Sequence, residues 1–160
     1  MDIHDQIANA PGKISRRLPY MAPGNYLLDV LKLDHIKSRK GKWFFVADFL
    51  VLESTNKDRP AGTKMSWMSN PEAGDGAGAN SIKVFLATLG DIEPDSVDAD
   101  GSRLAVSAQQ PFAGTLIQAN AYNIETRAGQ DFTVVDWENI SEEGQKLRSA
   151  AYEAIGLRAA

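Results

Sequence analysis

Two long apolar segments joined by a short basic turn constrain this chain most. Residues 25–37 (NYLLDVLKLDHIK) and 43–54 (WFFVADFLVLES) alternate apolar and polar side chains over much of their length, which is typical of β-strands. The alternation breaks at Val30-Leu31, as it does where a strand carries a β-bulge. The intervening Arg39–Lys42 has the length and the glycine of a tight turn. We therefore predict an antiparallel hairpin at the centre of a mainly β domain.

The rest of the chain adds three strands and two helices to this hairpin. The patterns predict strands at 64–69, 114–126 and 131–137, a helix that Asn80-Ser81 caps and Gly90 ends, and a C-terminal helix over 141–160. Residues 1–23 are predicted to be an irregular arm, because Pro11, Pro19 and Pro23 oppose regular structure. The element order over 24–140 is that of a five-stranded Greek-key barrel with a helix between strands three and four, the OB-fold.

Composition narrows the chemistry that the chain can perform. It has 160 residues, no cysteine and two histidines, His4 and His35. Disulfides, thiolate nucleophiles and cysteine-ligated zinc are thereby excluded, and a histidine-based site has little to work with. We expect neither a cofactor nor an enzymatic activity. The first twenty residues lack a continuous apolar stretch, so we also expect a cytoplasmic protein without a membrane anchor.

Charge is distributed unevenly along the chain. The formal net charge is −4, which by itself argues against a nucleic-acid partner. Residues 1–42, however, hold eight Lys or Arg against four Asp or Glu, with the densest group at Lys37-Ser38-Arg39-Lys40-Gly41-Lys42. An acidic protein with one basic loop is compatible with binding DNA.

The two predicted hairpins share a sequence pattern. Residues 36–49 and 124–137 both follow I-x-[ST]-R-x-G-x-x-F-x-V-x-D-[FW], with six of fourteen positions identical. Glycine in a tight turn and alternating Phe and Val in a strand account for part of the pattern. They do not account for Arg39 and Arg127. In an OB-fold these turns flank the nucleic-acid groove, so the two arginines are predicted phosphate contacts, with solvated turn charges as the alternative.

Three segments carry a resemblance to a known family. The run Gly24-Asn-Tyr-Leu-Leu-Asp-Val, the hairpin 38–49 and the strand and turn 114–130 resemble bacteriophage single-stranded DNA-binding proteins of the OB-fold type. The resemblance covers residues 24–137 and implies sequence-independent binding of single strands in phage DNA replication, recombination or repair. It implies replication or recombination proteins as further partners. Many such proteins end in an acidic tail, whereas this chain ends in Gly156-Leu-Arg-Ala-Ala160.

Binding a strand without reading its sequence requires cations for phosphates and aromatic rings for bases. The basic candidates are Lys37, Arg39, Lys40, Lys42, Lys64 and Arg127. The aromatic candidates are Trp43, Phe44, Trp67, Tyr122 and Phe132. Tyr122 is the first choice for stacking, because it follows the outward-facing Gln118 and Asn120. Trp43 comes next, and Trp67 has a core position as its alternative.

The faces of the second strand can be assigned from Asp48, which lies in its middle. Burial of Asp48 inside a barrel would be costly. The core set is therefore predicted to be Phe45, Ala47, Phe49 and Val51. The opposite face, with Phe44, Val46, Leu50 and Leu52, is too apolar for solvent and is predicted to lie under the C-terminal helix or against a second copy of the chain.

Other motifs are rejected on their residues. The glycine-rich 71–81 lacks the Gly-Lys-Ser/Thr of a phosphate-binding loop, and Asp98-Ala-Asp100-Gly101 lacks the glutamate that completes a calcium loop. Asp48 and Asp136 occupy matching places, for which turn or backbone hydrogen bonds are favoured over paired catalysis. The competing function is a structural or assembly β-barrel protein of a phage particle. A small metal-dependent nuclease is a weaker third hypothesis, since no histidine–carboxylate cluster is present.

Overall fold

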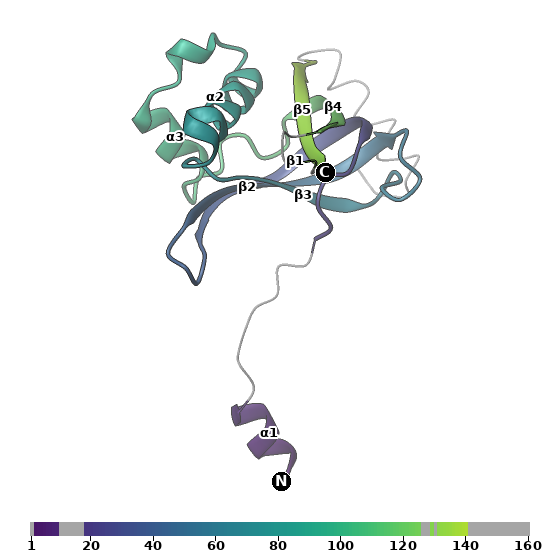
Figure 1. Cartoon of the computed structure of the whole chain (residues 1–160), viewed down its shortest axis with the longest axis vertical. Helices are drawn as coiled ribbons and strands as arrows, with labels where there is room; N and C mark the ends of the chain where they lie inside the picture. Colours follow the sequence, from purple (N-terminus) through teal and green to yellow (C-terminus); the bar gives the residue numbers. More distant parts are fainter. Residues whose placement is uncertain (1, 10–17, 126–128, 130, 141–160) are drawn as a thin grey trace.

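The protein forms one five-stranded antiparallel sheet, and the helices that follow its third strand lie on one side of it (Figure 1). The computed structural model describes residues 2–9, 18–125, 129 and 131–140. The elements are α1 (Ile3–Asn9), β1 (Gly24–Lys37), β2 (Trp43–Ser54), β3 (Lys64–Ser69), η1 (Gly74–Gly76), α2 (Ala77–Gly90), η2 (Pro94–Ser96), α3 (Ala99–Ala105), β4 (Leu116–Glu125) and β5 (Asp131–Asn139). The prediction of a mainly β fold with a helix between the third and fourth strands is confirmed.

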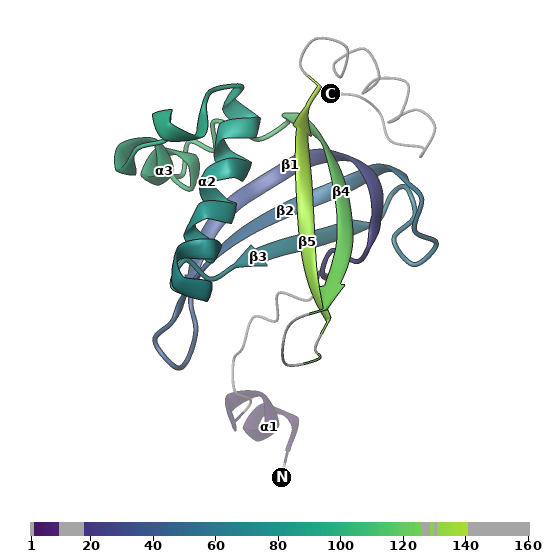
Figure 2. The ribbon, with the colours of Figure 1, turned by 45° about the horizontal axis from the view of Figure 1, so that its top comes forward.

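The long first strand makes the sheet curl. β1 pairs with β2 along nearly its whole length, but it pairs with β4 only over Gly24–Asp29. Its pairing register with β2 shifts between Val30 and Lys32, which confirms the predicted bulge. The strand order is β3-β2-β1-β4-β5, and β4 and β5 cross the other three strands at a steep angle in Figure 2. Among the described residues β3 and β5 are not paired, so the sheet is open between them.

An aromatic core fills the inside of the curl. The predicted inward set, Phe45, Ala47, Phe49 and Val51, is buried and confirmed. α2 contributes Phe85, which is fully buried and lies 4.5 Å from Trp137 and 5.2 Å from Trp67, measured between ring centroids. Trp67 and Trp137 themselves meet at 5.2 Å. Side chains from β3, α2 and β5 thus bridge the side on which the backbone leaves the sheet open.

The opposite face of the sheet is also apolar. Leu27, Leu50, Leu52 and Leu116 form a second buried cluster, and Val46 on the same face of β2 is 2% exposed. The prediction that this face avoids solvent is confirmed for Val46, Leu50 and Leu52, whereas Phe44 is half-buried. The C-terminal helix predicted over 141–160 lies outside the described residues, so its role as a cover and the alternative of a second copy stay predictions.

Two helix boundaries differ from expectation. The predicted irregular arm is wrong at Ile3–Asn9, which form α1, because all the prolines of the arm come after this segment. α2 begins at Ala77 and not at Asn80-Ser81, after Gly76 at φ +97°. Its second residue, Gly78, lies against the carbonyl of Asn70, and a Cβ at this position would collide with that oxygen. Because only glycine fits here, the first turn of α2 lies directly against the residue that follows β3.

In the acidic stretch after α2, Asp98 caps a short helix. α3 begins after Asp98, whose Oδ1 accepts a hydrogen bond of 2.7 Å from the backbone N–H of Gly101. This is an N-cap, which satisfies a helix N–H that has no partner within the helix. The motif considered for calcium thus caps a short helix that packs beside α2 in both views.

Candidate functional site

A large cavity lies in the opening of the sheet between β3, α2 and β5. It has a volume of about 790 Å³, and we call it the β3–β5 groove. Figure 2 shows β5 crossing β3 with α2 beside them. Its described lining residues are Tyr20, Met21, Phe44, Ser66, Trp67, Met68, Ser69, Asn80, Ser81, Val84, Phe132, Thr133, Val134, Val135 and Trp137. None of these side chains is charged.

Five of the lining residues are aromatic. Phe132 is 59% exposed and Tyr20 is 63% exposed, whereas Phe44 is half-buried. Trp67 and Trp137 are anchored in the aromatic core through Phe85. The groove therefore has a rigid aromatic wall and free rings at its rim. Hydroxyl and amide groups from β3, α2 and β5 provide hydrogen-bonding partners between them.

The end of the N-terminal arm forms part of the groove. Residues 19–21 run alongside β3, where the Ser66 N–H donates to the Pro19 carbonyl and the Met21 N–H donates to the Ser66 carbonyl, both at 2.9 Å. Arg59 Nε donates to the Tyr20 carbonyl at 3.0 Å. These bonds hold Tyr20 at the groove, although the domain was predicted to begin only at residue 24. The arm has no strand pattern, so the sequence offered no signal for this contact.

The repeated sequence pattern has a structural counterpart. The turn glycines Gly41 and Gly129 have φ angles of +78° and +74°, the conformation that a tight turn requires. The matched residues Phe44 and Phe132 line the same groove from β2 and β5. The last matched pair, Phe49 and Trp137, packs in the core with ring centroids 5.8 Å apart. The repeat therefore places equivalent rings from two hairpins around one opening.

The β1–β2 hairpin is the basic part of the site. Lys37, Arg39, Lys40 and Lys42 are all exposed. Trp43 is 45% exposed, with Lys37 Nζ 5.7 Å from the centre of its ring and the His35 ring at 5.3 Å. This is an arrangement of one accessible ring among cations. Arg127, the predicted counterpart of Arg39, lies outside the described residues.

Two predicted site residues, Lys64 and Tyr122, lie outside both the groove lining and the basic hairpin. Lys64 is exposed at the start of β3, at the end of the strand opposite to Ser69. Tyr122 is 39% exposed and faces outward from β4, as predicted, opposite Val134. In the next rung of the same face Ile124 lies opposite Phe132, and both are exposed. Tyr122 therefore belongs to an apolar surface that adjoins the rim of the groove through Val134 and Phe132.

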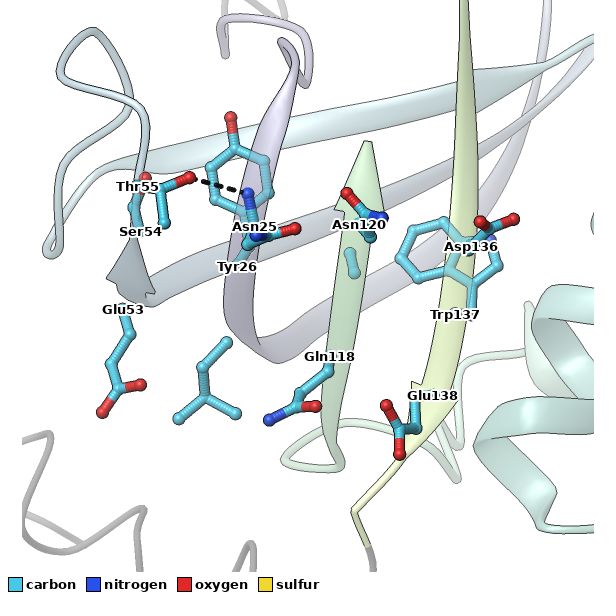
Figure 3. A pocket seen from close by; sticks show the side chains of 12 residues that line it. Asn25, Tyr26, Glu53, Ser54, Thr55, Gln118, Asn120, Asp136, Trp137 and Glu138 are labelled. Atoms are coloured by element: carbon cyan, nitrogen blue, oxygen red, sulfur yellow. Dashed lines mark hydrogen bonds between the residues drawn. The ribbon is translucent and has the colours of Figure 1, made fainter. Parts of the chain in front are cut away.

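A second large cavity lies on the outer face of the sheet (Figure 3). It has a volume of about 690 Å³, and we call it the acidic pocket. Two successive rungs on the same face of the paired strands provide most of its lining: Glu53, Leu27, Gln118 and Glu138, then Thr55, Asn25, Asn120 and Asp136. The lining holds three carboxylates and, among the described residues, no cation.

The matching aspartates are not brought together. Asp48 Oδ1 accepts a hydrogen bond of 2.7 Å from Ser66 Oγ between β2 and β3. Asp136 instead lines the acidic pocket on β5. Within the described part of the chain, no three His, Asp or Glu side chains gather as they would to hold a metal ion.

Tyr26 lines the acidic pocket and is bonded to the end of the N-terminal arm, whose residues Tyr20 and Met21 line the β3–β5 groove. Its side chain is 3% exposed, and its hydroxyl donates a hydrogen bond of 2.6 Å to the Ala22 carbonyl. Burial raises the pKa of the Tyr26 hydroxyl, while a hydrogen bond with Asn56 and the charge of Arg59 oppose the rise. The bond holds the end of the arm against β1.

Comparison with family models and curated proteins identifies no family for this chain. No protein-family model matches the chain, and no curated protein matches it. Among the described residues no helix is both long and apolar enough to span a membrane. The function of the chain is therefore inferred from the geometry of the groove, the basic hairpin and the acidic pocket.

Proposed function

We propose that this chain binds single-stranded DNA without sequence preference, in phage replication, recombination or repair, and performs no chemistry on it. The observation that carries the proposal is an uncharged, aromatic groove beside a basic hairpin. Bases would lie in the β3–β5 groove against Phe44 and Phe132, and phosphates would contact Lys37, Arg39, Lys40 and Lys42. Replication or recombination proteins and a second copy of the chain are further candidate partners.

The strand order supports an OB-fold as the architecture. An OB-fold is a partly open five-stranded Greek-key barrel. Opening such a barrel between its third and fifth strands gives the order β3-β2-β1-β4-β5 that this sheet has. The helix between β3 and β4 lies at the opening, where its Phe85 packs between Trp67 and Trp137. In this fold the face of strands two and three and the loops 1–2 and 4–5 bind oligonucleotides.

Stacking explains why such binding would ignore sequence. Every base has an aromatic face, so a ring binds any base, and each stacked base contributes about 1–3 kcal/mol. The half-buried Phe44 and the exposed Phe132 present rings from two sides of the groove. A base that is paired in a duplex is stacked on its neighbours and has no free face. The groove therefore favours single strands over duplex DNA.

The first experiment is a titration of the full chain with poly(dT), poly(rU) and duplex DNA at several salt concentrations. We expect poly(dT) to bind more tightly than duplex. Log affinity should fall linearly with log salt, with a slope of about −0.7 for each phosphate contact. Arg39→Ala and Lys40→Ala should each flatten the slope by about one contact. Lys57→Ala is the matched control, because Lys57 is exposed on the β2–β3 loop at the other end of the sheet.

One observation favours the competing function. Tyr122, Ile124 and Phe132 form an exposed apolar surface on the β4–β5 hairpin, and such surfaces are often protein interfaces. A structural protein of a phage particle would use this surface for self-assembly. A chain that fails to bind poly(dT) at low salt but forms oligomers, and loses them in Phe132→Ser, would contradict DNA binding and support assembly.

A further inference from the structure

A third cavity lies on the other side of the basic hairpin, between β1, β2, α2 and α3. Its volume is about 360 Å³. His35 and Trp43 form one wall, Lys83 of α2 and Arg103 of α3 line the other, and the apolar floor includes Phe45 and Leu86. We call it the α2–α3 pocket. No sequence pattern marks Lys83 or Arg103 as a binding residue.

We infer that the α2–α3 pocket is a second nucleotide subsite, in which Trp43 stacks on one base and Lys83 and Arg103 hold the adjoining phosphates. This inference rests on the proposed function and extends it, because it gives the single strand a path past the groove. The helices after β3 would then take part in binding, in addition to supporting the sheet.

The environment of Trp43 is the first support. A tryptophan on a strand next to a turn gains more by burial than by exposure, yet this side chain is 45% exposed. Lys37 Nζ lies 5.7 Å from its ring centre, and the His35 ring lies at 5.3 Å and an angle of 50°. A cation beside an accessible ring provides stacking for a base and charge for its phosphate at one place.

The two cations on the far wall are available to a phosphate. Lys83 Nζ lies 3.7 Å from Asp95 Oδ1, and Arg103 Nη1 lies 2.9 Å from Asp100 Oδ1. Both aspartates are almost fully exposed, at 104% and 93%. Exposed ion pairs of this kind contribute little to stability, so a phosphate can replace either aspartate.

The remaining acid at the pocket is engaged elsewhere. Asp98 lines the pocket, but its Oδ1 accepts the Gly101 N–H at the start of α3. An aspartate at this position also interacts favourably with the positive end of the helix dipole. Its charge therefore opposes a phosphate less than that of a solvated aspartate would.

The α2–α3 pocket adjoins the β3–β5 groove. Phe44 lines both cavities. Trp43 directly precedes Phe44 and is the first residue of β2, so a strand that passes the end of β2 beyond Phe44 has the Trp43 ring as its neighbour. The volume of about 360 Å³ is near the lower limit for ligand pockets, and suits one nucleotide better than a helical peptide.

The test compares three single-cation variants of the full chain. Lys83→Ala and Arg103→Ala should each flatten the salt dependence of poly(dT) binding by about 0.7, while Lys57→Ala leaves it unchanged. Trp43→Ala should weaken binding about 5- to 150-fold, and Trp43→Phe should restore most of the loss, because it keeps an aromatic face. Melting temperatures identify any variant that has lost its fold.

Two results would overturn the inference and leave the proposed function intact. In the first, the parent binds poly(dT) but Lys83→Ala and Arg103→Ala both behave as Lys57→Ala does. In the second, an acidic peptide with apolar side chains binds the parent and not Arg103→Ala, while DNA binding is equal in both proteins; the pocket would then serve a protein partner. A parent that does not bind poly(dT) at low salt contradicts the proposed function and this inference together.

Discussion

The β3–β5 groove and the acidic pocket are similar in size and share Trp137, yet their chemistry is opposite. The groove measures about 790 Å³ and has no charged lining residue among those described, whereas the pocket measures about 690 Å³ and holds three carboxylates. A phosphate would be repelled from the pocket and would meet no charge in the groove. The comparison shows that a net charge of −4 says little about partners until the acids are located.

The change from one chemistry to the other occurs along single strands. On the outer face of β5, Phe132 and Val134 near the turn are followed by Asp136 and Glu138. The partners on β4 change at the same place, from apolar side chains (Ile124 and Tyr122) to amides (Asn120 and Gln118). One β4–β5 hairpin therefore offers rings at its turn end and acids at its other end.

The largest expected effect comes from removing the rings. Phe132→Ala should weaken poly(dT) binding about 5- to 150-fold, because it removes an exposed ring of the groove, and Phe44→Ala should do likewise. Since no charge changes, the salt slope should stay the same. Tyr122→Ala should have a smaller effect, because Tyr122 lies outside the groove lining. If Tyr122→Ala weakens binding more than Phe132→Ala does, the strand follows the outer face of β4.

The same acid placed in each region gives a sharper comparison. Ser81→Asp adds a carboxylate at the groove, and Gln118→Asp adds one at the acidic pocket; both positions are exposed. We expect Ser81→Asp to weaken binding about 10-fold, as about 1.4 kcal/mol of repulsion from a nearby phosphate would. Gln118→Asp should change affinity less than twofold at physiological salt. Equal losses in the two variants would show that DNA approaches both regions.

Much of the architecture follows from the sequence, and for identifiable reasons. The bulged first strand, the hairpin to Ser54 and the inward set of β2 were predictable because alternation and a turn glycine are local signals. Phe44 and Phe132 were found as a pair because the repeated pattern marks them. That they meet in one groove depends on the curl of the sheet, which no local pattern encodes.

The contacts missed by the sequence analysis are all long-range. Tyr20 reaches the groove through backbone bonds to Ser66, and no pattern in the arm predicts an added strand. Gln110 lies at φ +45° and its side-chain amide bonds to both the N–H and the C=O of Leu33, at 2.8 Å each. The Gln110 side chain thus provides the hydrogen bonds to Leu33 that a neighbouring strand would otherwise make, beyond the point where β4 leaves β1. A glutamine in an unpatterned loop gives no sign of this role.

Denaturant unfolding tests the hydrogen bond of Tyr26, which connects the acidic pocket to the arm that lines the groove. Tyr26→Phe removes the bond to Ala22 and should lower the free energy of unfolding by about 0.5–1.5 kcal/mol. Since the pKa of Tyr26 is raised in the folded state, the parent loses stability above about pH 10, where the unfolded chain ionises first. The gap between parent and variant should therefore shrink as the pH rises above 10, which denaturant unfolding at several pH values would measure. A gap that widens would mean that the folded state favours the ionised tyrosine.

The smallest expected effect comes from neutralising the acidic pocket. Glu53→Gln with Glu138→Gln should raise the affinity for poly(dT) less than twofold in 0.15 M salt, because ions screen charges over about 8 Å. The increase should grow in dilute salt, where screening is weaker. An increase above tenfold in 0.15 M salt would mean that the bound strand passes close to this pocket.

The most direct test locates the strand by photocrosslinking. Oligothymidine that carries 4-thiothymidine is irradiated with the full chain, and the crosslinked residues are identified by sequencing the digested peptides. Crosslinks should fall on Trp43, Phe44 and Phe132. Glu53 and Glu138, which lie on the same tryptic peptides as these rings, should carry no label. Crosslinks concentrated on Glu53, Gln118 or Glu138, or no crosslink at a concentration where poly(dT) binding is saturated, would contradict the claim that the groove and the basic hairpin bind DNA.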